Sequence, residues 1–600
     1  MRSAADRENI PDCDVLVVGS GASGLTAAVT AAFFGLKVLV AEKLPVIGGT
    51  TARTAGSIWI PGNDIAVKRG IEDSPEKAHA YLREVCGGHF DEGRVNAFLE
   101  NAPRAIRFLL GRTSLSVFCP KVGSDYHLET ANSLAVGRSL YTAPFDGRWL
   151  GEYFYKLALP PPTYSFMGIS PQLGIDVLHF AHANRSLRSA THVLGLCVRQ
   201  VVDRTIYGRG TRLTNGAALA GRLLRSALDF EVDVETSTSV SALLCDKRKV
   251  VGAVMDTATG SRRVSVRCGV VLASGGFSQN TSLRDNYFST QMAPHREWSA
   301  TSLGAVGSGL ELARSAGGTV NDSMAEPAAW SPMSLVPTDE YTVQPLPLFG
   351  GRASPGIIAV LHNGKRFVDE ASPYHDFSIA LLHSTHNEPE PCAYLICDSL
   401  ALRRYGLGWV RPYPIPHWHH LRTGYLSRAN TIEELATKLR IDVPGLTATV
   451  ATVNRDARNG MDSEFGKGAT AYDLRMGDER HGPNPCVAPL ERAPFYAIKV
   501  VVGDIGTYVG VSTDENSRVL DSAAAPVPGL YAAGNDVGSP FGGSDPAGGT
   551  MLGPAITSGY MAGCHLAGID PRSASEGQMT RILRSTMGGA ELPLHYGSML

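Results

Sequence analysis

The chain has 600 residues, of which 44% are hydrophobic and 19% charged, so it is long enough for two or more globular units. Lys and Arg number 55 against 57 Asp and Glu, and the formal net charge is −2. This balance gives no reason to expect nucleic acid or an anionic membrane as a partner. The ten cysteines form no CxxC pair, which favours reduced thiols.

The N-terminal residues MRSAADRENIPDCD contain no apolar stretch of signal-peptide type. No run of about 18 apolar residues occurs anywhere, so no transmembrane segment is predicted. We therefore expect a cytoplasmic protein, with peripheral contact with a membrane left open.

The first predicted elements form a dinucleotide-binding unit. Residues 15–18 are apolar or β-branched and predict a buried parallel strand. GSGASG follows at 19–24, then a predicted helix over LTAAVTAAFFG (25–35), then a predicted strand over LKVLVAE (36–42). Strand, glycine turn, helix and strand in this order predict a Rossmann-like site.

Each part of this unit has a physical role. Gly19 permits the tight turn, Gly21 lets the backbone approach a pyrophosphate, and Gly24 lets helix and strand pack closely. The N-terminus of the helix presents free N–H groups to the phosphates. Glu42 ends the second strand, where an acidic side chain can accept hydrogen bonds from ribose hydroxyls.

Three glycine-rich segments bear on which dinucleotide binds. After Glu42 comes a loop rich in small residues (43–63), where a simple NAD domain would show another regular βαβ repeat. Residues 265–280 predict a strand and a glycine turn, and 529–563 predict a strand, a glycine turn and a helix.

These segments resemble the FAD motifs of the fumarate reductase/succinate dehydrogenase flavoprotein superfamily, and the resemblance implies FAD as the cofactor. Together with the fingerprint, it implies these cofactor contacts: Gly19, Gly21, Ala22, Ser23, Gly24, Glu42, Lys43, Gly49, Thr50, Thr51, Ser57, Gly275, Gly276, Gly534, Asn535, Gly553, Pro554 and Ala555. The resemblance implies an α/β fold: a Rossmann-like FAD domain of the glutathione-reductase type with an inserted α+β substrate (cap) domain. Because the motifs lie at both ends of the chain, we expect a discontinuous FAD domain over 1–290 and 490–573. The substrate domain would then span 291–489, followed by a C-terminal tail over 574–600, with the active site between the domains.

Succinate dehydrogenases carry a histidine in the loop after the first motif. Residues 43–63 contain none, so the resemblance implies non-covalent FAD.

Further stretches narrow the resemblance to the 3-ketosteroid Δ1-dehydrogenases, over roughly residues 12–570. GRSLYTAPFDGRWLG (137–151) and YGRGTRLTNG (207–216) carry it most specifically. In that family a base removes the proton α to a carbonyl, the β-carbon gives hydride to flavin N5, and hydrogen-bond donors hold the carbonyl oxygen. The resemblance implies this 1,2-desaturation here, on a small apolar ketone of the 3-ketosteroid type.

The resemblance also implies catalytic residues. Tyr374, in NGKRFVDEASPY (363–374), matches the base, and Tyr126 matches the tyrosine that assists it. Gly549 matches the glycine whose N–H binds the carbonyl. In the family a tyrosine hydroxyl binds the same carbonyl, but Asp545 stands at the position of that tyrosine here. Asp545 could be protonated and donate a hydrogen bond, could face a donor on another kind of substrate, or could point away from it.

Other functions stay open at this point. Enoate reductases of the fumarate or urocanate type use an arginine that follows the GKRFV-like stretch, but no arginine lies between Arg366 and Arg403. A Δ4-type or non-steroidal cyclic-ketone desaturase, or a flavin-binding protein without turnover, are further alternatives. No NAD(P) site is visible beyond the FAD fingerprint, so a quinone or another carrier would be the external electron acceptor. The run HWHH (417–420) lacks acid or thiol partners, and we predict no metal site.

Overall fold

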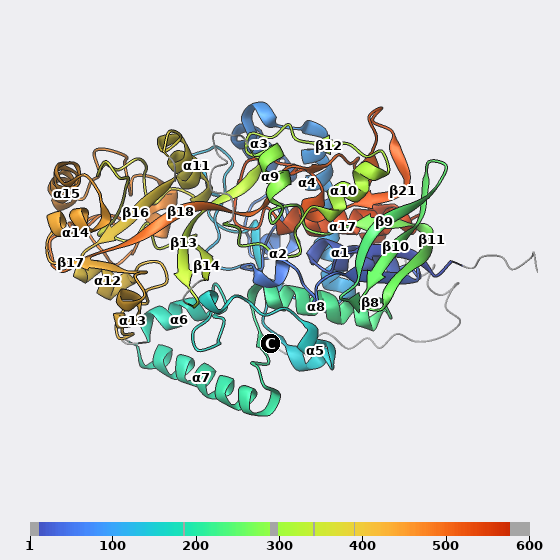
Figure 1. The fold of residues 1–600 in the computed structure, drawn as a ribbon, viewed down its shortest axis with the longest axis horizontal. Coiled ribbons are helices and arrows are strands. Elements are labelled where there is room, and N and C mark those ends of the chain that lie inside the picture. The colour runs from blue at the N-terminus through green and yellow to red at the C-terminus, as the bar shows by residue number, and fades with distance from the viewer. Residues whose placement is uncertain (1–10, 184–185, 289–297, 340–341, 389–390, 576–600) are drawn as a thin grey trace, which may run out of the picture.

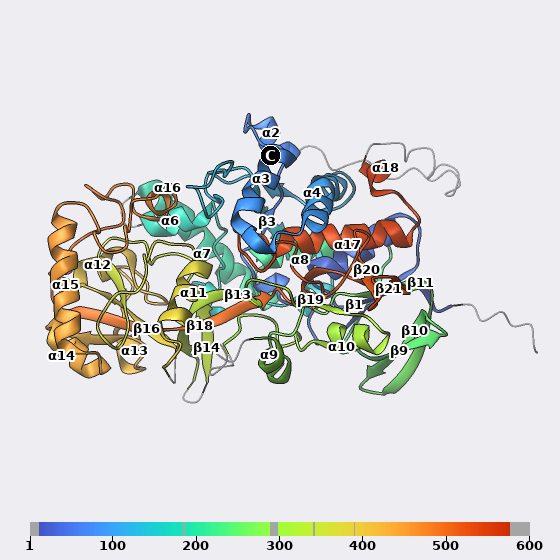
Figure 2. The same cartoon turned by 90° about the horizontal axis from the view of Figure 1, so that it is seen from above.

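The computed structural model describes residues 11–183, 186–288, 298–339, 342–388 and 391–575. Two sheets lie toward opposite ends of an elongated molecule (Figure 1; Figure 2 gives the view from above). The helices are α1 Ala22–Phe33, α2 Asp64–Lys68, α3 Pro75–Cys86, α4 Glu92–Arg112, α5 Tyr153–Lys156, α6 Asp176–His182, α7 Leu187–Tyr207, α8 Asn215–Asp229, α9 Thr281–Tyr287, α10 Ser308–Ser315, α11 Tyr374–Ser384, α12 Ser399–Tyr405, α13 Trp418–Arg422, α14 Ile432–Leu439, α15 Val443–Arg458, α16 Ala471–Met476, α17 Leu552–Leu566 and α18 Pro571–Ser575.

The first sheet holds the predicted dinucleotide unit. Its main order is β20-β21-β11-β1-β2-β8, and β21, β11, β1, β2 and β8 are parallel. The antiparallel strands β9 and β10 continue from β11. Its strands are β1 Cys13–Val18, β2 Val38–Glu42, β8 Asp233–Thr236, β9 Ser239–Asp246, β10 Lys249–Thr257, β11 Gly260–Leu272, β20 Arg518–Leu520 and β21 Pro526–Ala532.

Successive side chains of β1 point to opposite faces of the sheet and pack in two different hydrophobic clusters. Val15 and Val17 pack on the side of α1, α4, α8 and α17, whereas Leu16 and Val18 join a second cluster on the other face. α17 packs on α1 through glycines: a Cβ at Gly559 would lie 2.4 Å from the carbonyl oxygen of Ser23. The closing helix is therefore held directly against the helix that follows the glycine turn.

The second sheet is antiparallel, in the order β14-β13-β18-β16-β15, with β17 paired to β18. Its strands are β13 Ala328–Pro337, β14 Val343–Pro347, β15 Ile357–Val360, β16 Cys392–Cys397, β17 Ser427–Ala429 and β18 Phe495–Thr507. Shorter pairings involve β3 Ser57–Trp59, β4 Val117–Phe118, β5 Ser139–Thr142, β6 Phe145–Asp146, β7 Arg212–Leu213, β12 Val320–Asn321 and β19 Gly510–Val511.

The predicted α/β class with a Rossmann-like FAD domain is confirmed. The boundary predicted at 490 precedes β18, which pairs with β13 and β16, so a strand of the second sheet comes from a segment that we assigned to the FAD domain. One buried cluster also joins Leu16 of the first sheet to Leu395 of the second. Of the predicted tail, 574–575 end α18 and 576–600 lie outside the described residues.

Residues 151–183 and 186–210 form an arm along one side of the molecule, in which α6 and α7 pack on each other (Figure 1). Within the described ranges, no helix combines the length and the apolar character that a bilayer crossing requires.

Candidate active site

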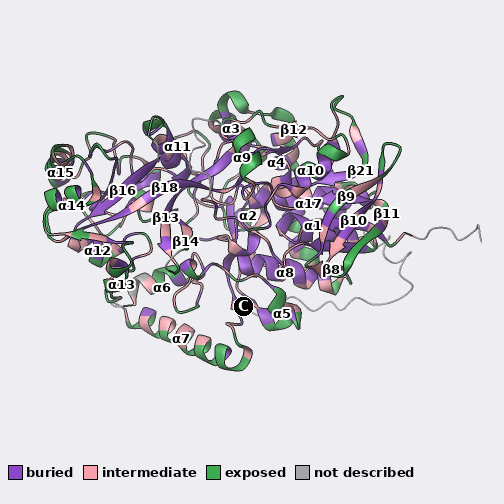
Figure 3. Cartoon of the chain, in the orientation of Figure 1, coloured by how far each residue is buried: buried purple, intermediate pink, exposed green. Residues whose placement is uncertain are grey.

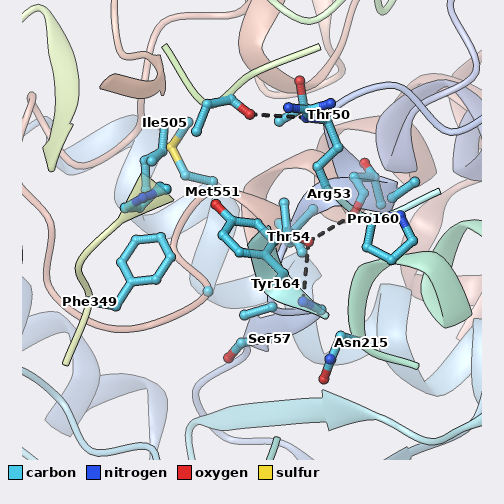
Figure 4. Close-up of a pocket in the computed structure, with 18 of the residues that line it drawn as sticks. Thr50, Arg53, Thr54, Ser57, Pro160, Tyr164, Asn215, Phe349, Ile505 and Met551 are labelled. Carbon is cyan, nitrogen blue, oxygen red and sulfur yellow. Dashed lines mark hydrogen bonds between the residues drawn. The ribbon is translucent and has the colours of Figure 1, made fainter. Parts of the chain in front are cut away.

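A cavity of about 850 Å³ lies between the two sheets. One end is lined by the glycine turn after β1 and by residues 49–57. The other end is lined by residues that follow position 340, among them 346–352, Tyr374 and 405–409. In Figure 4, Phe349 and Ile505 lie on one side of this cavity and Arg53 and Pro160 on the other. The cavity volume and its position between the sheets are those of a ligand site.

Two glycines of the turn after β1, Gly19 and Gly24, leave no room for a side chain. Gly19 has φ +111°, and a Cβ there would lie 2.3 Å from the carbonyl oxygen of Ala273. A Cβ at Gly24 would lie 2.1 Å from the carbonyl oxygen of Gly19. The N–H of Ala22 donates to Thr51 Oγ1 (2.9 Å), which brings the 49–57 loop to the N-terminus of α1. These contacts agree with the roles predicted for Gly19 and Gly24.

Glu42 is buried at the end of β2 and lines the cavity. Its carboxylate accepts hydrogen bonds from the Ser20 hydroxyl (2.5 Å) and from the N–H of Leu44 (2.9 Å). The Ser20 oxygen in turn accepts from the N–H of Gly48 (3.0 Å). Glu42 thus ties the turn to the next loop, and its contact with ribose hydroxyls stays a prediction.

Asp536 is a residue that the sequence reasoning missed. It is buried, and it accepts hydrogen bonds from the N–H of Ser274 (2.5 Å) and of Gly276 (2.8 Å). Burial raises the pKa of its carboxyl group. Asp536 therefore joins the second and third glycine-rich segments, although it directly follows the predicted contact residue Asn535 and had no motif of its own.

Most predicted cofactor residues line the cavity, namely Gly19, Gly21, Ala22, Ser23, Glu42, Lys43, Gly49, Thr50, Thr51, Ser57, Gly275, Gly534, Asn535 and Ala555. Gly24, Gly276, Gly553 and Pro554 are not among the lining residues. Gly553 packs on β3, since its Cβ would lie 2.3 Å from the carbonyl oxygen of Trp59. A cradle of backbone groups at a helix N-terminus fits a dinucleotide diphosphate.

The two predicted tyrosines meet at the other end of the cavity. The rings of Tyr374 and Tyr126 lie edge to face, 5.6 Å apart between centroids. Phe349 packs on Tyr374 (5.0 Å) and Tyr472 on Tyr126 (5.7 Å). All four line the cavity. The structure therefore brings together residues separated by more than 200 positions, and it adds Tyr472, for which the sequence offered no signal.

Neither tyrosine is ionised at neutral pH in this environment. Burial, and then the charge of Asp545, raises the pKa of Tyr374 well above 10. The same two causes raise the pKa of Tyr126 well above 10. A neutral phenol can accept a substrate proton only if its own proton moves to a neighbouring acceptor.

Asp545 lies near the Tyr374 hydroxyl and is not among the residues that line the cavity. It is buried, and its Oδ1 accepts a hydrogen bond from Thr550 Oγ1 (2.6 Å). Its Oδ2 has no hydrogen-bond partner among the described residues. Burial raises the pKa of Asp545 to about 6, while Thr550 and the nearby Tyr374 hydroxyl act to lower it. The three readings of Asp545 therefore stay predictions, and the neighbour that its carboxylate offers them is the Tyr374 hydroxyl.

Gly549 supplies a free donor to the cavity. Its carbonyl oxygen accepts from the N–H groups of Trp59 (3.2 Å) and Gly553 (2.9 Å), whereas no hydrogen bond uses its own N–H among the described residues. Gly549 has φ +107°, and a Cβ would lie 2.7 Å from the Trp59 nitrogen. This position requires glycine, and its N–H is available for a carbonyl oxygen.

Arginines also line the cavity, and the sequence reasoning missed them. Arg352 is buried and donates to the carbonyl oxygens of Glu370 (2.7 Å) and Ser372 (3.2 Å), which fixes the turn before Tyr374. Arg53 donates from Nε to the Ala300 carbonyl oxygen (3.2 Å; Figure 4). The terminal nitrogens of Arg53 have no hydrogen-bond partner in the part of the chain that the structure describes.

Two other predicted features lie away from the cavity. Arg366, in the GKRFV-like stretch, is buried in ion pairs with Glu370 (2.8 Å) and Asp462 (2.7 Å). In the HWHH run, His420 packs against Trp409 (4.9 Å between ring centroids). Among the described residues, no group of His, Cys, Asp and Glu side chains could hold a metal ion.

Fold and site together define a flavin-dependent oxidoreductase, and comparison with known proteins gives its family. The family profile described as "FAD binding domain" matches residues 14–552. The chain belongs to this family, and its cofactor is FAD.

Curated relatives include 4-oxocyclohex-2-ene-1-carboxylate 5-dehydrogenase of Sinomonas cyclohexanicum, 37% identical over 92% of this chain and 94% of that protein. The 3-oxosteroid 1-dehydrogenase of Mycobacterium tuberculosis (strain ATCC 25618 / H37Rv) is 34% identical over 93% of this chain and 99% of its own. The crystal structure of 3-ketosteroid Δ1-dehydrogenase from Sterolibacterium denitrificans in complex with 1,4-androstadiene-3,17-dione matches with a TM-score of 0.85, at 32% identity over 93% of this chain and 99% of that chain. These findings confirm the resemblance to 3-ketosteroid Δ1-dehydrogenases.

Proposed function

We propose that the protein is an FAD-dependent dehydrogenase that introduces a C=C bond α,β to a ring ketone, with a 3-ketosteroid-like substrate. The observation that carries this proposal is one cavity that joins a dinucleotide cradle to Tyr374, Tyr126 and the free N–H of Gly549. When bound, FAD supplies the acceptor for the hydride that leaves the β-carbon.

The residues of this chain handle the proton and the carbonyl oxygen. The Gly549 N–H binds the carbonyl oxygen and stabilises the charge that develops there as the α C–H bond breaks. Tyr374 takes the α-proton and passes its own hydroxyl proton to Asp545, so no isolated phenolate forms in the buried site. Tyr126 packs on Tyr374 and fixes the ring in place. Asp545 thereby serves as the proton acceptor of the base, not as a ligand of the carbonyl.

The test mixes the holoenzyme, without oxygen, with ring ketones that have a saturated C–C bond next to the carbonyl, and follows the flavin absorbance. We expect bleaching with a 3-keto-4-ene steroid and, after turnover with an artificial electron acceptor, a product that has lost two hydrogens next to the carbonyl. Bleaching by no ketone, together with oxidation of reduced enzyme by fumarate, would instead assign the protein to the enoate reductases.

A second candidate substrate is a cyclohexanone that carries a carboxylate. Arg53 and Arg411 line the cavity, and neither forms an ion pair with a carboxylate among the described residues. Relatives of this chain include dehydrogenases whose names specify oxocyclohexane- and oxocyclohexene-carboxylates. An unpaired guanidinium in a partly buried cavity favours an anionic ligand group. A comparison of 4-oxocyclohexane-1-carboxylate with its methyl ester separates the candidates, because only an anion-binding site prefers the acid.

A further inference from the structure

Asp545 must lose a proton after every turnover of the proposed reaction. Its side chain is buried, with only 4% of the residue exposed. Oδ1 accepts a hydrogen bond from Thr550 Oγ1 (2.6 Å), whereas Oδ2 has no hydrogen-bond partner among the described residues. Burial raises the pKa of Asp545 to about 6, so at pH 8 the carboxyl group does not keep the proton. A group this deeply buried needs a neighbour that reaches solvent in order to release it.

His127 stands opposite Asp545 in a short backbone pairing. The two segments run antiparallel, with an isolated bridge between Asp125 and Ala547. Two positions further along this register, His127 is opposed to Asp545, and side chains at opposed positions have Cβ atoms about 5 Å apart. Burial raises the pKa of Asp545, and His127 is one of the groups that act to lower it, which agrees with this proximity. His127 is therefore placed to exchange a proton with this carboxyl group.

His127 also reaches the surface. Its Nδ1 lies 3.6 Å from Glu129 Oε1 and 3.9 Å from Asp376 Oδ2. The side chains of His127, Glu129 and Asp376 are 24%, 58% and 40% exposed. Asp376 belongs to the first turn of α11, which lies near the edge of the molecule (Figure 3). An imidazole takes up and releases protons near neutral pH, and it can use either nitrogen, so His127 can pass a proton from the interior to the solvent.

Two other side chains of this region do not reach solvent. His375 follows Tyr374 in α11 and is 3% exposed, and its Nδ1 accepts a hydrogen bond from the N–H of Trp330 (3.1 Å). Burial lowers the pKa of His375 to about 4, so this imidazole does not hold a proton at neutral pH. Tyr508 packs on His375 (5.9 Å between ring centroids) and is 1% exposed. Neither side chain can carry a proton to the surface by itself.

Given the proposed function, we propose that His127 takes the proton from Asp545 after each turnover and releases it to solvent. The substrate gives its α-proton to Tyr374, the hydroxyl proton of Tyr374 passes to Asp545, and the proton of Asp545 passes to His127 and then to water. Each transfer breaks one bond to hydrogen and forms another, so every group returns to its starting state and one proton leaves for each C=C bond formed. His127 is not among the cavity-lining residues, so its loss should slow proton release and leave the first C–H cleavage unchanged.

The test is stopped-flow mixing of the FAD-loaded protein with a ketone that bleaches it, in weak buffer at pH 8 with a pH indicator dye and no electron acceptor. In the parent protein, the dye should respond as fast as the flavin. In His127→Ala, the flavin should bleach at an unchanged rate, because Asp545 is still ionised at this pH, while the dye should respond about tenfold more slowly or worse. The matched control is His79→Ala, because the side chain of His79 is 25% exposed and pairs with Glu92 (2.7 Å). This control should behave like the parent.

Rescue separates proton transfer from a structural role. With an artificial electron acceptor, kcat of His127→Ala should fall about tenfold at unchanged KM, and added imidazole should restore it, because the free base replaces the missing side chain. The proposal fails if His127→Ala releases its proton as fast as the parent, or if imidazole does not restore the lost kcat. A parent protein that no ketone bleaches would overturn the proposed function as well. Normal bleaching with unchanged proton release in the variant would overturn the role of His127 alone.

Discussion

The two ends of the cavity are built by different means. The nucleotide end consists of backbone: Gly19 and Gly24 approach neighbouring carbonyl groups so closely that no side chain fits. The substrate end consists of side chains that meet from distant parts of the chain, such as Tyr126, Tyr374 and Asp545. A backbone cradle tolerates little change, whereas a side-chain site can exchange one residue and keep its shape. Relatives can therefore share the cofactor and differ in substrate.

The largest effect should come from a substitution in the glycine turn that forms the nucleotide end of the cavity. Gly19→Ala places a Cβ 2.3 Å from the Ala273 carbonyl oxygen, at φ +111°, so the turn must move away from the diphosphate site. We expect colourless protein with FAD affinity reduced by about 100-fold or more. The control is Gly35→Ala, at φ +85° with no atom within 4 Å, which should bind FAD normally in a fluorescence titration. Equal flavin content in both variants would contradict the proposal that the turn at Gly19 holds the FAD diphosphate.

The next effect tests the side-chain end without disturbing the cradle. Tyr374→Phe removes the hydroxyl that takes the α-proton, so kcat should fall by about 10³-fold while the flavin content stays unchanged. Tyr405→Phe is the control, because Tyr405 also lines the cavity but its hydroxyl is bonded to Asp478 (2.9 Å). Stopped-flow bleaching of the flavin measures the step directly. Unchanged bleaching in Tyr374→Phe would mean that another group is the base.

The same contrast explains what the sequence could predict. The glycine turns and their strands follow from local spacing, because a tight turn against a diphosphate needs glycine at fixed positions. The expected strand, helix and strand at the N-terminus are β1, α1 and β2. The closing helix is α17, and the contact of Gly553 and Pro554 with the cofactor stays a prediction, since neither is among the cavity-lining residues.

The residues of the substrate end could be predicted only through family resemblance, and only at the positions where this chain has the same residue as the family. Tyr374 and Tyr126 do lie together, but no local pattern marks Arg352 or Tyr472, since each reaches the cavity through tertiary packing. The direction of Asp545 was not predictable either, because its burial depends on the path of the whole 544–550 loop. The place of β18 in the second sheet likewise depends on long-range pairing.

A smaller effect tests the proposed role of Asp545 as the acceptor of the Tyr374 proton. If its carboxylate accepts the proton of Tyr374, it must be ionised, so kcat should fall as the pH drops through about 6, the raised pKa of Asp545. Asp545→Asn should lose about 10- to 100-fold in kcat at pH 8 and lose this pH dependence. The same pH dependence of kcat in both proteins would rule out proton transfer from Tyr374 to Asp545.

The same variant should gain stability. The pKa of Asp545 is raised from 3.8 to about 6 by folding, so the folded protein binds a proton more tightly than the unfolded chain. The resulting penalty is fully present above pH 6 and disappears as the pH falls from 6 to 4. Asp545→Asn should therefore be more stable by about 1–3 kcal/mol at pH 8, with a smaller difference at pH 4, as measured by urea unfolding of the FAD-loaded protein.

The smallest effect distinguishes substrates at the side-chain end. Arg53→Gln removes a positive charge whose terminal nitrogens have no partner among the described residues, so KM for an oxocyclohexane carboxylate should rise about tenfold while its methyl ester is unaffected. Arg248→Gln, at an exposed ion pair far from the cavity lining, is the control. A loss of FAD affinity in Arg53→Gln would show instead that this arginine contacts the cofactor diphosphate. An equal rise in KM for acid and ester, with FAD affinity unchanged, would leave the guanidinium a packing role and favour the uncharged, steroid-like ketone.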